Sequence, residues 1–243
     1  MHKSLKILIL TDSTSWMNKY NTDLKQKLEK LGHLVKLIHS KNEIENSDVA
    51  FFLSCFEIIS NNLLSLSKNN IVVHASNLPK GKGWSPASWQ ILEGENTIPL
   101  TLFEANEKTD AGKIYIQDKL LLDGSELLDE WQKKLGKKIV QMCLEYVLKR
   151  DTIKGIPQQG EETFYKKRTH KDSELDINKT IKEQFNLLRI VDNEKYPAFF
   201  KFKNKIYTLK IESVKLQERE REREKTLARM ASLFSLELRL LNV

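Results

Sequence analysis

Two side chains with the chemistry of proton transfer stand at the ends of predicted strands. His74 closes the apolar run 70–74, and Asp110 lies in the loop Thr109-Asp110-Ala111-Gly112 between two later strands. A neutral imidazole accepts a proton, and a carboxylate orients the imidazole or takes a proton itself, so the pair suits general acid–base catalysis. Residue type alone leaves a second role open, because a histidine at a strand end also serves as a structural hydrogen-bonding group.

The elements that must position this pair are short apolar runs that alternate with helical patterns. The predicted strands are residues 5–11, 33–39, 48–54, 70–74, 97–104 and 114–122. The predicted helices are residues 20–31, 57–67, 85–94 and 125–149, and the third has Ser85 as N-cap and Pro86 as first helical residue. This order predicts an α/β fold with an open, mostly parallel, Rossmann-like sheet. Ligands bind such sheets outside the carboxyl ends of the strands, where His74 would emerge together with residues 11–13 and 54–56.

The part of the chain after Gly155 has a different pattern. It is polar through residues 157–172, continues with a predicted helix at 179–189, and then has two alternating runs, 196–202 and 205–211, which predict a β-hairpin turning at Lys203 and Asn204. Apolar residues of the last segment form one helical stripe: Leu227, Met230, Phe234, Leu238 and Leu241. We expect a terminal helix that docks on the body or on a second subunit; a tail for a membrane surface or RNA is the alternative.

Composition narrows the class of protein. The chain has 243 residues and a net charge of +7, which suits nucleic acid, an anionic membrane or a phosphorylated small molecule. No apolar run approaches the roughly 20 residues of a membrane helix, and the first residues lack a signal-peptide pattern. Cys55 and Cys143 are far apart in sequence, so we expect a cytoplasmic protein with neither a disulfide framework nor a metal site. The phosphate loops of dehydrogenases and P-loop NTPases are absent from the sequence.

Several blocks of sequence resemble one enzyme family. HASNLPKGKGWSPASWQILEG, residues 74–94, and EANEKTDAGKIY, residues 104–115, are similar to the pattern of formyltetrahydrofolate-dependent formyltransferases, which runs N-x-H-x-S-x-L-P-x-x-x-G and then D-x-G. That family includes the catalytic domain of methionyl-tRNA formyltransferases. Two later blocks, QQGEETFYKKRTHKDSELD and EQFNLLRIVDNEKYPAFF, resemble the branch that formylates amino groups of nucleotide-linked deoxysugars. The resemblance extends over about residues 6–211.

The resemblance implies a reaction and its catalytic residues. His74 matches the catalytic histidine and Asp110 the catalytic aspartate, in a formyltransferase catalytic domain over residues 1–155. A neutral amine would attack the formyl carbon of N10-formyltetrahydrofolate, and the oxyanion that forms needs a preorganised donor. Protonated His74 would stabilise the oxyanion, while Asp110 accepts the proton of the amine directly or through water. No metal is expected.

The resemblance also implies binding residues. The cofactor-binding set is Leu53, Ser54, Cys55, Phe56, Ile58, Glu104, Ala105 and Asn106. The set for the nucleotide sugar is Lys80, Lys82, Gly83, Trp84, Tyr165, Arg168 and Tyr196, part of which lies in an appendage over residues 156–243 with the hairpin and the terminal helix. Ammonium groups and backbone N–H groups of a glycine-rich loop suit a diphosphate, and aromatic rings suit a sugar or base. The alternatives are a solvated loop with a packing Trp84, a solvated charge run around Arg168, and a core position for Tyr196.

One position departs from the family pattern. The family carries an asparagine two residues before the histidine, where this chain has Val72. Strand alternation puts Asn70 on the same face but farther back. Asn77, in the loop after His74, is a nearer amide and our candidate for the third catalytic residue, with a backbone N–H group as the alternative.

These observations predict one function and leave two others open. We expect formyl transfer to the amino group of a nucleotide-linked amino-deoxysugar, dTDP- or UDP-linked and of the 4-amino-4,6-dideoxyglucose type, for lipopolysaccharide O-antigen or other surface glycan synthesis. The partners would be folate and the nucleotide sugar, without membrane or nucleic acid, in a homodimer that packs through the hairpin. The alternatives are a folate-dependent formyltransferase acting on another amine such as methionyl-tRNA, and a non-catalytic, basic nucleic-acid-binding protein.

Overall fold

The computed structural model describes residues 3–214. Residues 1–209 form one compact unit and residues 210–243 a second. The structure thus draws its unit boundary after Leu209, and the functional boundary predicted after residue 155 stays a prediction. The predicted terminal helix lies outside the described residues. Within residues 3–214, no helix is both long and apolar enough to cross a membrane.

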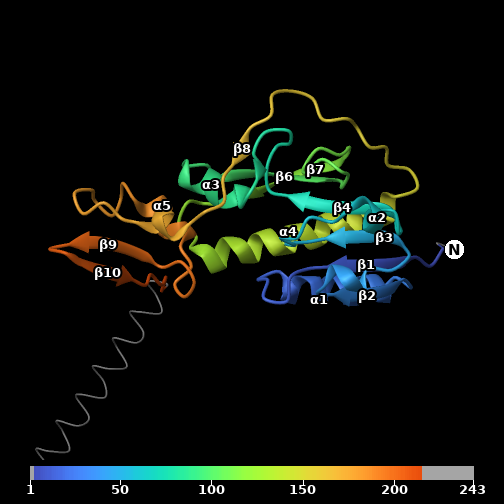
Figure 1. The fold of residues 1–243 in the computed structure, drawn as a ribbon, viewed down its shortest axis with the longest axis horizontal. Coiled ribbons are helices and arrows are strands. Elements are labelled where there is room, and N and C mark those ends of the chain that lie inside the picture. The colour runs from blue at the N-terminus through green and yellow to red at the C-terminus, as the bar shows by residue number, and fades with distance from the viewer. Residues whose placement is uncertain (1–2, 215–243) are drawn as a thin grey trace, which may run out of the picture. The chain divides into compact units, whose positions relative to one another are not determined.

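A six-stranded sheet forms the centre of the first unit (Figure 1). Its order is β2-β1-β3-β4-β6-β7, with β1 at Lys6–Leu10, β2 at Leu34–Ile38, β3 at Ser47–Phe52, β4 at Ser67–His74, β6 at Thr97–Glu104 and β7 at Ile114–Leu121. The four strands β2, β1, β3 and β4 are parallel, whereas β6 runs antiparallel to both β4 and β7. The predicted open, mostly parallel α/β sheet is confirmed.

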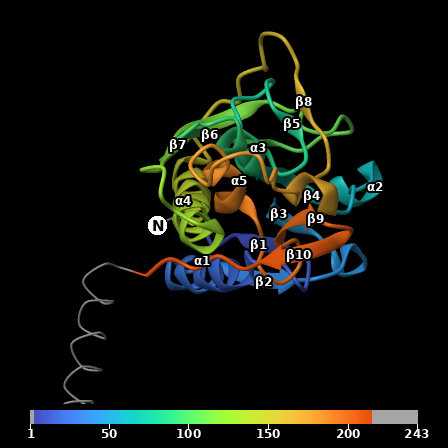
Figure 2. The same ribbon diagram turned by 90° about the vertical axis from the view of Figure 1, so that its left-hand side faces the viewer.

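The two faces of the sheet bury alternate residues of each strand, as a period of two requires. Ile7 and Ile9 of β1 pack in one cluster with the long helix α4 (Leu128–Lys149) and with α1 (Asn18–Lys30), while Leu8 and Leu10 pack in a second cluster. Figure 2 shows α1 and α4 on the same side of β1. The second cluster lies under the short helix α2 (Asn61–Leu64) and the 3-10 turn η1 (Lys41–Glu43). The parallel strands are therefore covered on both faces.

The remaining elements follow the sheet or lie beside it. Helix α3 spans Pro86–Leu92 and α5 spans Phe185–Ile190, with the turn η2 at His170–Ser173 between β8 and α5. Two short strands, β5 (Lys82–Gly83) and β8 (Phe164–Tyr165), pair in parallel. The hairpin is confirmed: β9 (Ala198–Phe202) and β10 (Lys205–Leu209) pair antiparallel around Lys203 and Asn204, whose φ angles of 44° and 60° are those of a tight hairpin turn.

The predicted helices differ from the observed ones at their ends, most of all the second. The helix predicted at residues 57–67 was wrong for most of its length, because it is helical only at Asn61–Leu64 and β4 already begins at Ser67. Residues 53–60 therefore form an irregular loop at the sheet edge. Helix α4 starts at Leu128 rather than at residue 125, because the Glu126 carboxylate accepts backbone hydrogen bonds from Asp123 and Gly124 in a turn of its own.

The other differences are smaller. Helix α5 is confined to Phe185–Ile190, and the Gln184 side chain binds the backbone of Asp176 in the part predicted to be helical. Ser85 is the N-cap of α3 as predicted, but it adopts φ 48° and its hydroxyl makes no capping hydrogen bond. Proline at the first helical position, Pro86, supplies the start of the helix instead.

Candidate active site

His74 lies at the carboxyl end of β4, where the chain leaves the sheet. Two side chains fix its exit: Gln90 Nε2 donates to the Ala75 carbonyl at 2.6 Å, and Thr101 Oγ1 donates to the Ser76 carbonyl at 2.7 Å. The His74 side chain is 11% exposed. The histidine is therefore held in a defined place and still reachable from solvent.

The imidazole of His74 has one defined tautomer. Its Nε2 lies 2.9 Å from the Gly81 carbonyl oxygen, and a carbonyl only accepts hydrogen bonds, so Nε2 carries the proton. In the neutral ring the lone pair is then on Nδ1, which has no hydrogen-bond partner among the described residues. The ring thus keeps one nitrogen for the protein and presents the other for proton transfer.

Asp110 is brought to the same ring by the loop between β6 and β7. Its Oδ2 lies 3.9 Å from His74 Nε2 and accepts a hydrogen bond of 3.0 Å from the Gly83 N–H. Asp110 has φ 53°, a backbone conformation that costs a non-glycine residue about 1–2 kcal/mol. The side chain is 11% exposed, like that of His74. The structure therefore unites the two residues predicted as the catalytic pair, and their catalytic roles remain predictions.

A steric constraint explains why the D-x-G pattern has a glycine at position 112. A β-carbon on Gly112 would lie 1.6 Å from the Glu104 carbonyl oxygen, a separation no side chain tolerates. The loop that carries Asp110 therefore passes directly against the end of β6. Only glycine permits that approach.

Residues predicted to bind the cofactor come from two loops that converge. Cys55, after β3, and Ala105, after β6, pack against the same apolar cluster as Val72 of β4. Beyond them, Phe56 and Ile58 are 63% and 78% exposed, although both are large and apolar. Leu53 differs, because its side chain is buried in the main core. The loop after β3 therefore presents an apolar surface at the carboxyl edge of the sheet.

Side chains that follow β1 hold the loop after β3 in place by hydrogen bonds. The Phe56 N–H donates to Asp12 Oδ2 at 3.1 Å, and the hydroxyl of Ser15 donates to that of Ser54 at 2.9 Å. Ser54 has φ 56°, which turns the chain sharply as it leaves β3. Asp12 belongs to the segment 11–13 that was predicted to emerge after β1, and Ser15 lies just beyond that segment.

Glu104 and Asn106 direct their side chains elsewhere. Burial raises the pKa of Glu104, whose carboxylate accepts hydrogen bonds from the Asn70 N–H and from the Tyr115 hydroxyl at 2.8 Å. The Asn106 amide oxygen accepts from the backbone of Lys108 in its own loop. Any contact of these two residues with a cofactor would therefore involve the backbone, and their predicted role remains a prediction.

The amides considered as substitutes for the family asparagine do not meet the pair. Asn70 Nδ2 donates to the Leu64 carbonyl, and its buried Oδ1 has no partner among the described residues. Asn77 is exposed, and its Oδ1 accepts from Gln117 Nε2 at 3.0 Å. The catalytic role of Asn77 remains a prediction, one that requires this amide pair to separate.

The loop after His74 uses part of its predicted phosphate-binding chemistry internally. The Lys82 ammonium is buried and pairs with Glu162 at 2.5 Å, and the Gly83 N–H is taken by Asp110. Lys80 is exposed. The Trp84 ring stacks on Phe56, with centroids 5.6 Å apart, and Lys167 Nζ lies 4.8 Å from the Trp84 centroid. An exposed lysine and a stacked aromatic pair thus remain for a ligand, whereas Lys82 has a structural partner.

The later predicted residues form a second aromatic group and a structural anchor. Tyr165 stacks on Trp89 with centroids 6.2 Å apart, and Lys166 Nζ lies 5.4 Å from the Trp89 centroid. Burial raises the pKa of Tyr165, whose hydroxyl donates to Glu93. Arg168 is half-buried, and desolvation lowers its pKa; it donates to the Ile190 carbonyl at 2.8 Å. Tyr196 is 44% exposed and lies just before the hairpin.

Sequence reasoning missed the residues that hold the pair from the far side. Gln158 Nε2 donates to the carbonyls of Asp110 and Gly112, and Thr163 Oγ1 accepts from the Gly81 N–H. Both belong to the block QQGEETFYKK, which we used only as a sign of the sugar branch. A polar run that follows a long helix carries no periodicity to reveal such contacts.

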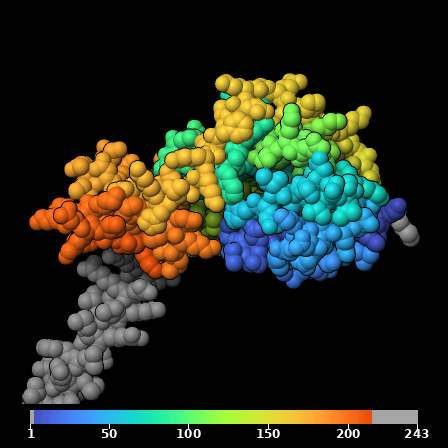
Figure 3. Space-filling view, viewed as in Figure 1, coloured from blue at the N-terminus to red at the C-terminus, as the bar shows by residue number. Residues whose placement is uncertain are grey.

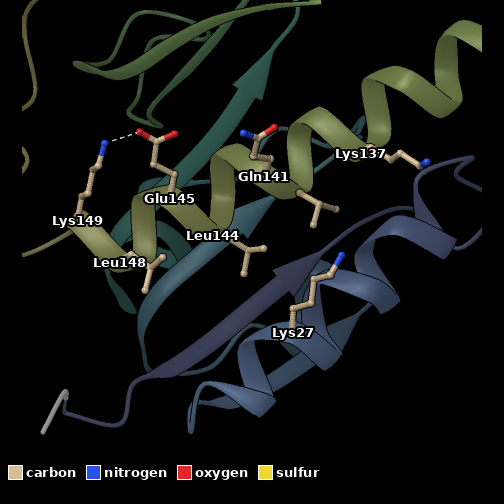
Figure 4. Close-up of a pocket in the computed structure, with 8 residues that line it drawn as sticks. Lys27, Lys137, Gln141, Leu144, Glu145, Leu148 and Lys149 are labelled. Carbon is tan, nitrogen blue, oxygen red and sulfur yellow. Dashed lines mark hydrogen bonds and ion pairs between the residues drawn. The ribbon is translucent and has the colours of Figure 1, made fainter.

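Neither of two cavities in the described residues is lined by His74 or Asp110. One of about 280 Å³ is lined in part by Asn77, Lys80, Gln117 and Gln159. A second, shown in Figure 4, lies between α1 and α4, where Leu144 and Leu148 face Lys27 and where Lys149 pairs with Glu145. The cavity of Figure 4 contains none of the predicted site residues. Residues 3–214 contain no group of three or more His, Cys, Asp or Glu that could hold a metal ion.

Comparison with known proteins identifies the family. The family described as formyl transferase matches residues 21–147, which include both His74 and Asp110. The chain belongs to that family. It is 28% identical over 173 residues to a methionyl-tRNA formyltransferase of Ehrlichia ruminantium, covering 70% of this chain and 55% of the relative. The chain therefore spans about half the length of the curated relatives it matches.

Two solved structures share the fold. HypX from Aquifex aeolicus in complex with tetrahydrofolic acid aligns with a TM-score of 0.71 and 18% identity, over 85% of this chain and 37% of that one. A 4-N formyltransferase from Francisella tularensis aligns with a TM-score of 0.61 and 19% identity, over 86% of this chain and 99% of that one. At these identities the likeness extends to the fold alone.

Proposed function

We propose that this chain transfers a formyl group from N10-formyltetrahydrofolate to an amine, and that the amine belongs to a nucleotide-linked amino sugar. The observation that carries the proposal is the His74–Asp110 pair, with Nε2 and Oδ2 3.9 Å apart at the carboxyl end of β4. Both residues lie inside the segment that matches the family. The alternative of a basic nucleic-acid-binding protein does not account for a largely buried histidine and carboxylate at this edge of the sheet.

The loop after β3 suits a folate. Phe56 and Ile58 are exposed apolar side chains, and Cys55 and Ala105 bring two loops together behind them. A pterin is a flat, partly apolar ring system that gains free energy when it is removed from water against such side chains. When bound, the cofactor would supply the formyl group in a form that is activated for transfer. The residues that would hold it are those of 53–58 and the backbone of 104–106.

The His74 ring supplies the proton chemistry. An amine that is acylated must lose a proton, and the leaving nitrogen must gain one. With Nε2–H bound to the Gly81 carbonyl, His74 can take the first proton on Nδ1. The resulting Nδ1–H can stabilise negative charge on the formyl oxygen or return the proton to the leaving nitrogen. Asp110 stabilises the positive charge that the ring then carries.

A nucleotide sugar is supported as the acceptor by the aromatic and basic residues beside the pair. Trp84 with Lys167 combines a flat ring with an ammonium group. Trp89 stacked on Tyr165 adds a second pair of rings, where the Lys166 ammonium already pairs with Asp172. Rings bind a base or a sugar face, and ammonium groups bind a diphosphate. We propose a dTDP- or UDP-linked 4-amino-4,6-dideoxy sugar, used in the cytoplasm for O-antigen or another surface glycan.

A homodimer through the hairpin belongs to the same proposal. Phe202, Ile206 and Tyr207 of β9 and β10 are 47%, 65% and 41% exposed, so a two-stranded hairpin carries apolar side chains in contact with water. Isolated hairpins are marginally stable, and a second copy would cover these side chains. A mass by light scattering that stays monomeric at all concentrations would contradict the dimer.

One alternative acceptor has specific support. The curated relatives are mostly named methionyl-tRNA formyltransferases, and the chain carries a net charge of +7, which suits a nucleic acid. The two acceptors separate in a direct assay. The protein is incubated with N10-formyltetrahydrofolate and either dTDP- or UDP-linked amino sugars or methionyl-tRNA. Tetrahydrofolate absorbance and the mass of the acceptor are then followed.

We expect tetrahydrofolate release and a formylated sugar, with no product on methionyl-tRNA. Formylation of methionyl-tRNA alone would overturn the proposed acceptor and leave the formyl transfer in place. An absence of product with every amine, from a folded protein that binds folate, would overturn the transferase itself.

A further inference from the structure

The distance between His74 and Asp110 depends on two different loops. One is the loop of residues 76–85 after β4, and the other is the loop between β6 and β7 that carries Asp110. The Gly81 carbonyl accepts from His74 Nε2, and the Gly83 N–H donates to Asp110 Oδ2. The loop of residues 76–85 therefore contacts both members of the pair. If this loop and the Asp110 loop shift relative to each other, the distance between Nε2 and Oδ2 changes with them.

A third segment binds both loops at once. Residues 156–165 are called the strap from here on. They come after α4 in the chain, run past β6 and β7, and end with β8 (Figure 1). In Figure 3 their yellow atoms lie against the green atoms of the β6–β7 region. Ile156 joins the start of β7 through two backbone hydrogen bonds of 2.8 Å with Ile114.

The first anchor of the strap lies on the Asp110 loop. Gln158 Nε2 donates to the Asp110 carbonyl at 3.0 Å and to the Gly112 carbonyl at 2.9 Å. The first of these bonds holds the carbonyl of the residue whose backbone adopts φ 53°, and the second holds the glycine two residues later. Without them, that unfavourable conformation would lose hydrogen bonds worth about 0.5–1.5 kcal/mol each.

The second anchor lies on the loop of residues 76–85. Thr163 Oγ1 accepts from the Gly81 N–H at 2.8 Å, and the Thr163 carbonyl accepts from the Lys82 N–H at 2.9 Å. The buried Lys82 ammonium pairs with Glu162 of the strap. A β-carbon on Gly83 would lie 2.5 Å from the Tyr165 carbonyl oxygen, so the backbones of the loop and of the strap are in direct contact.

We propose that the strap is a brace for the proposed catalytic pair, and that Gln158 and Thr163 are positioning residues that set the distance between His74 Nε2 and Asp110 Oδ2. The inference rests on the proposed function for its catalytic consequence. Gln158 fixes the loop that carries the carboxylate, and Thr163 fixes the N–H of the residue whose carbonyl holds the imidazole. Neither side chain contacts His74 or the Asp110 carboxylate, so each acts through the loop it binds.

The test removes the hydrogen bonds of the strap and keeps the side-chain volume. Gln158→Met loses the two donors, and the neighbouring Gln159→Met is the matched control because Gln159 is exposed and binds neither loop. Thr163→Val loses the acceptor hydroxyl, while Thr163→Ser restores it. We expect Gln158→Met and Thr163→Val to lower kcat about ten- to a hundredfold, the range for a misplaced catalytic group, with both KM values within about threefold.

The pH dependence separates positioning from simple loss of stability. In Gln158→Met and Thr163→Val the pH profile of kcat should shift, whereas Gln159→Met and Thr163→Ser should match the wild type in both kcat and profile. Melting temperatures are measured for all four variants. Wild-type kcat and profile in folded Gln158→Met and Thr163→Val would overturn the brace.

A readout without turnover keeps this inference distinct from the proposed function. Nitrogen NMR of ¹⁵N-histidine-labelled protein reports the tautomer of each ring, and the His74 signals are those lost in His74→Asn. We expect the Nε2–H form in the wild type and in Gln159→Met, and a shifted or mixed signal in Gln158→Met and Thr163→Val. Unchanged His74 signals in both would overturn the brace, even if no acceptor amine were ever formylated.

Discussion

The two loops that flank His74 are held in opposite ways. The loop of residues 76–85 binds Asp110, the strap and the Thr101 hydroxyl of β6, and its Lys82 is buried in an ion pair. The loop of residues 53–60 is fixed mainly by Asp12 and Ser15 and leaves Phe56 and Ile58 largely exposed. The first loop is therefore fixed by contacts within the protein, whereas the second presents apolar surface that a ligand would cover.

The stacked pair of Phe56 and Trp84 is where the two loops touch. Their rings lie 5.6 Å apart at 22°, one from each loop. A ligand on the side of residues 53–60 would therefore also affect the ring beside the proposed acceptor site. This comparison predicts that changes in the braced loop lower the rate, and that changes in the exposed loop raise the KM for folate.

The largest effect should come from the pair itself. His74→Asn and Asp110→Asn should each cut turnover by about two to four orders of magnitude, the range for general acid–base catalysis, with nucleotide-sugar affinity within a few fold. Turnover, ligand binding and melting temperature are measured for wild type and both variants. Normal turnover in a folded His74→Asn protein would end the catalytic interpretation of the pair.

The next largest effect concerns the close approach of the Asp110 loop to β6. In Gly112→Ala the new methyl group would lie 1.6 Å from the Glu104 carbonyl oxygen, so the loop or the strand end must move. We expect the free energy of unfolding to fall by about 3 kcal/mol, as for severe overpacking. Urea denaturation measures it, and Lys108→Ala, an exposed change in the same loop, serves as control. Equal stability of the two variants would show that the approach of the two segments is looser.

The fold was more predictable from sequence than the connections inside the site. Strand ends such as His74 and Glu104 follow from apolar runs with a clear boundary, and β6 was predicted with its observed limits. The Lys203–Asn204 turn was equally clear, because two alternating runs are separated by two polar residues, one of which, Asn204, is of a type that tolerates positive φ. Local sequence determines these features.

The contacts of Gln158, Thr163 and Lys82 depend on chain segments distant in sequence. Lys82 lies 80 residues from Glu162, and its buried ion pair looks in sequence like a free phosphate ligand. The short α2 was overestimated because residues 57–67 contain helix-compatible apolar residues, while pairing of Ser67 with Ser47 in the sheet ends the helix early. Tertiary hydrogen bonds decided these cases, and a single sequence does not record them.

Phe56 tests the exposed side of the comparison. Phe56→Ala removes a ring that is 63% exposed and stacked on Trp84. We expect the KM for the folate to rise about three- to tenfold, since an aromatic contact contributes about 0.5–1.5 kcal/mol beyond area burial, with kcat and melting temperature nearly unchanged. Steady-state kinetics with each substrate varied in turn measures this, and Ile181→Ala, a truncation of another exposed apolar side chain, is the control. A drop in kcat without a change in the folate KM would contradict this, because Phe56 would then act on the rate as the loop of residues 76–85 is expected to do.

The smallest effect should come from Asp172, whose side chain binds Lys166 and Thr169 in the segment that follows the strap. Burial alone would raise the pKa of Asp172, but hydrogen bonds from Lys166 Nζ and from the N–H and hydroxyl of Thr169 outweigh it and lower the pKa to about 2. A carboxyl group whose pKa is lower in the folded state stabilises the protein above its ordinary value near 3.8, and this contribution disappears as the pH falls toward 2. Because Lys166 is largely exposed and solvent screens the pair, we expect Asp172→Asn to lower the free energy of unfolding by about 1 kcal/mol at pH 7. Denaturation of wild type and variant between pH 7 and pH 2 should show the two stabilities converging, while Asp151→Asn, at an exposed ion pair, should match the wild type throughout. A difference that persists at pH 2 would mean that Asp172 acts through packing, and that the chain after the strap is held without its charge.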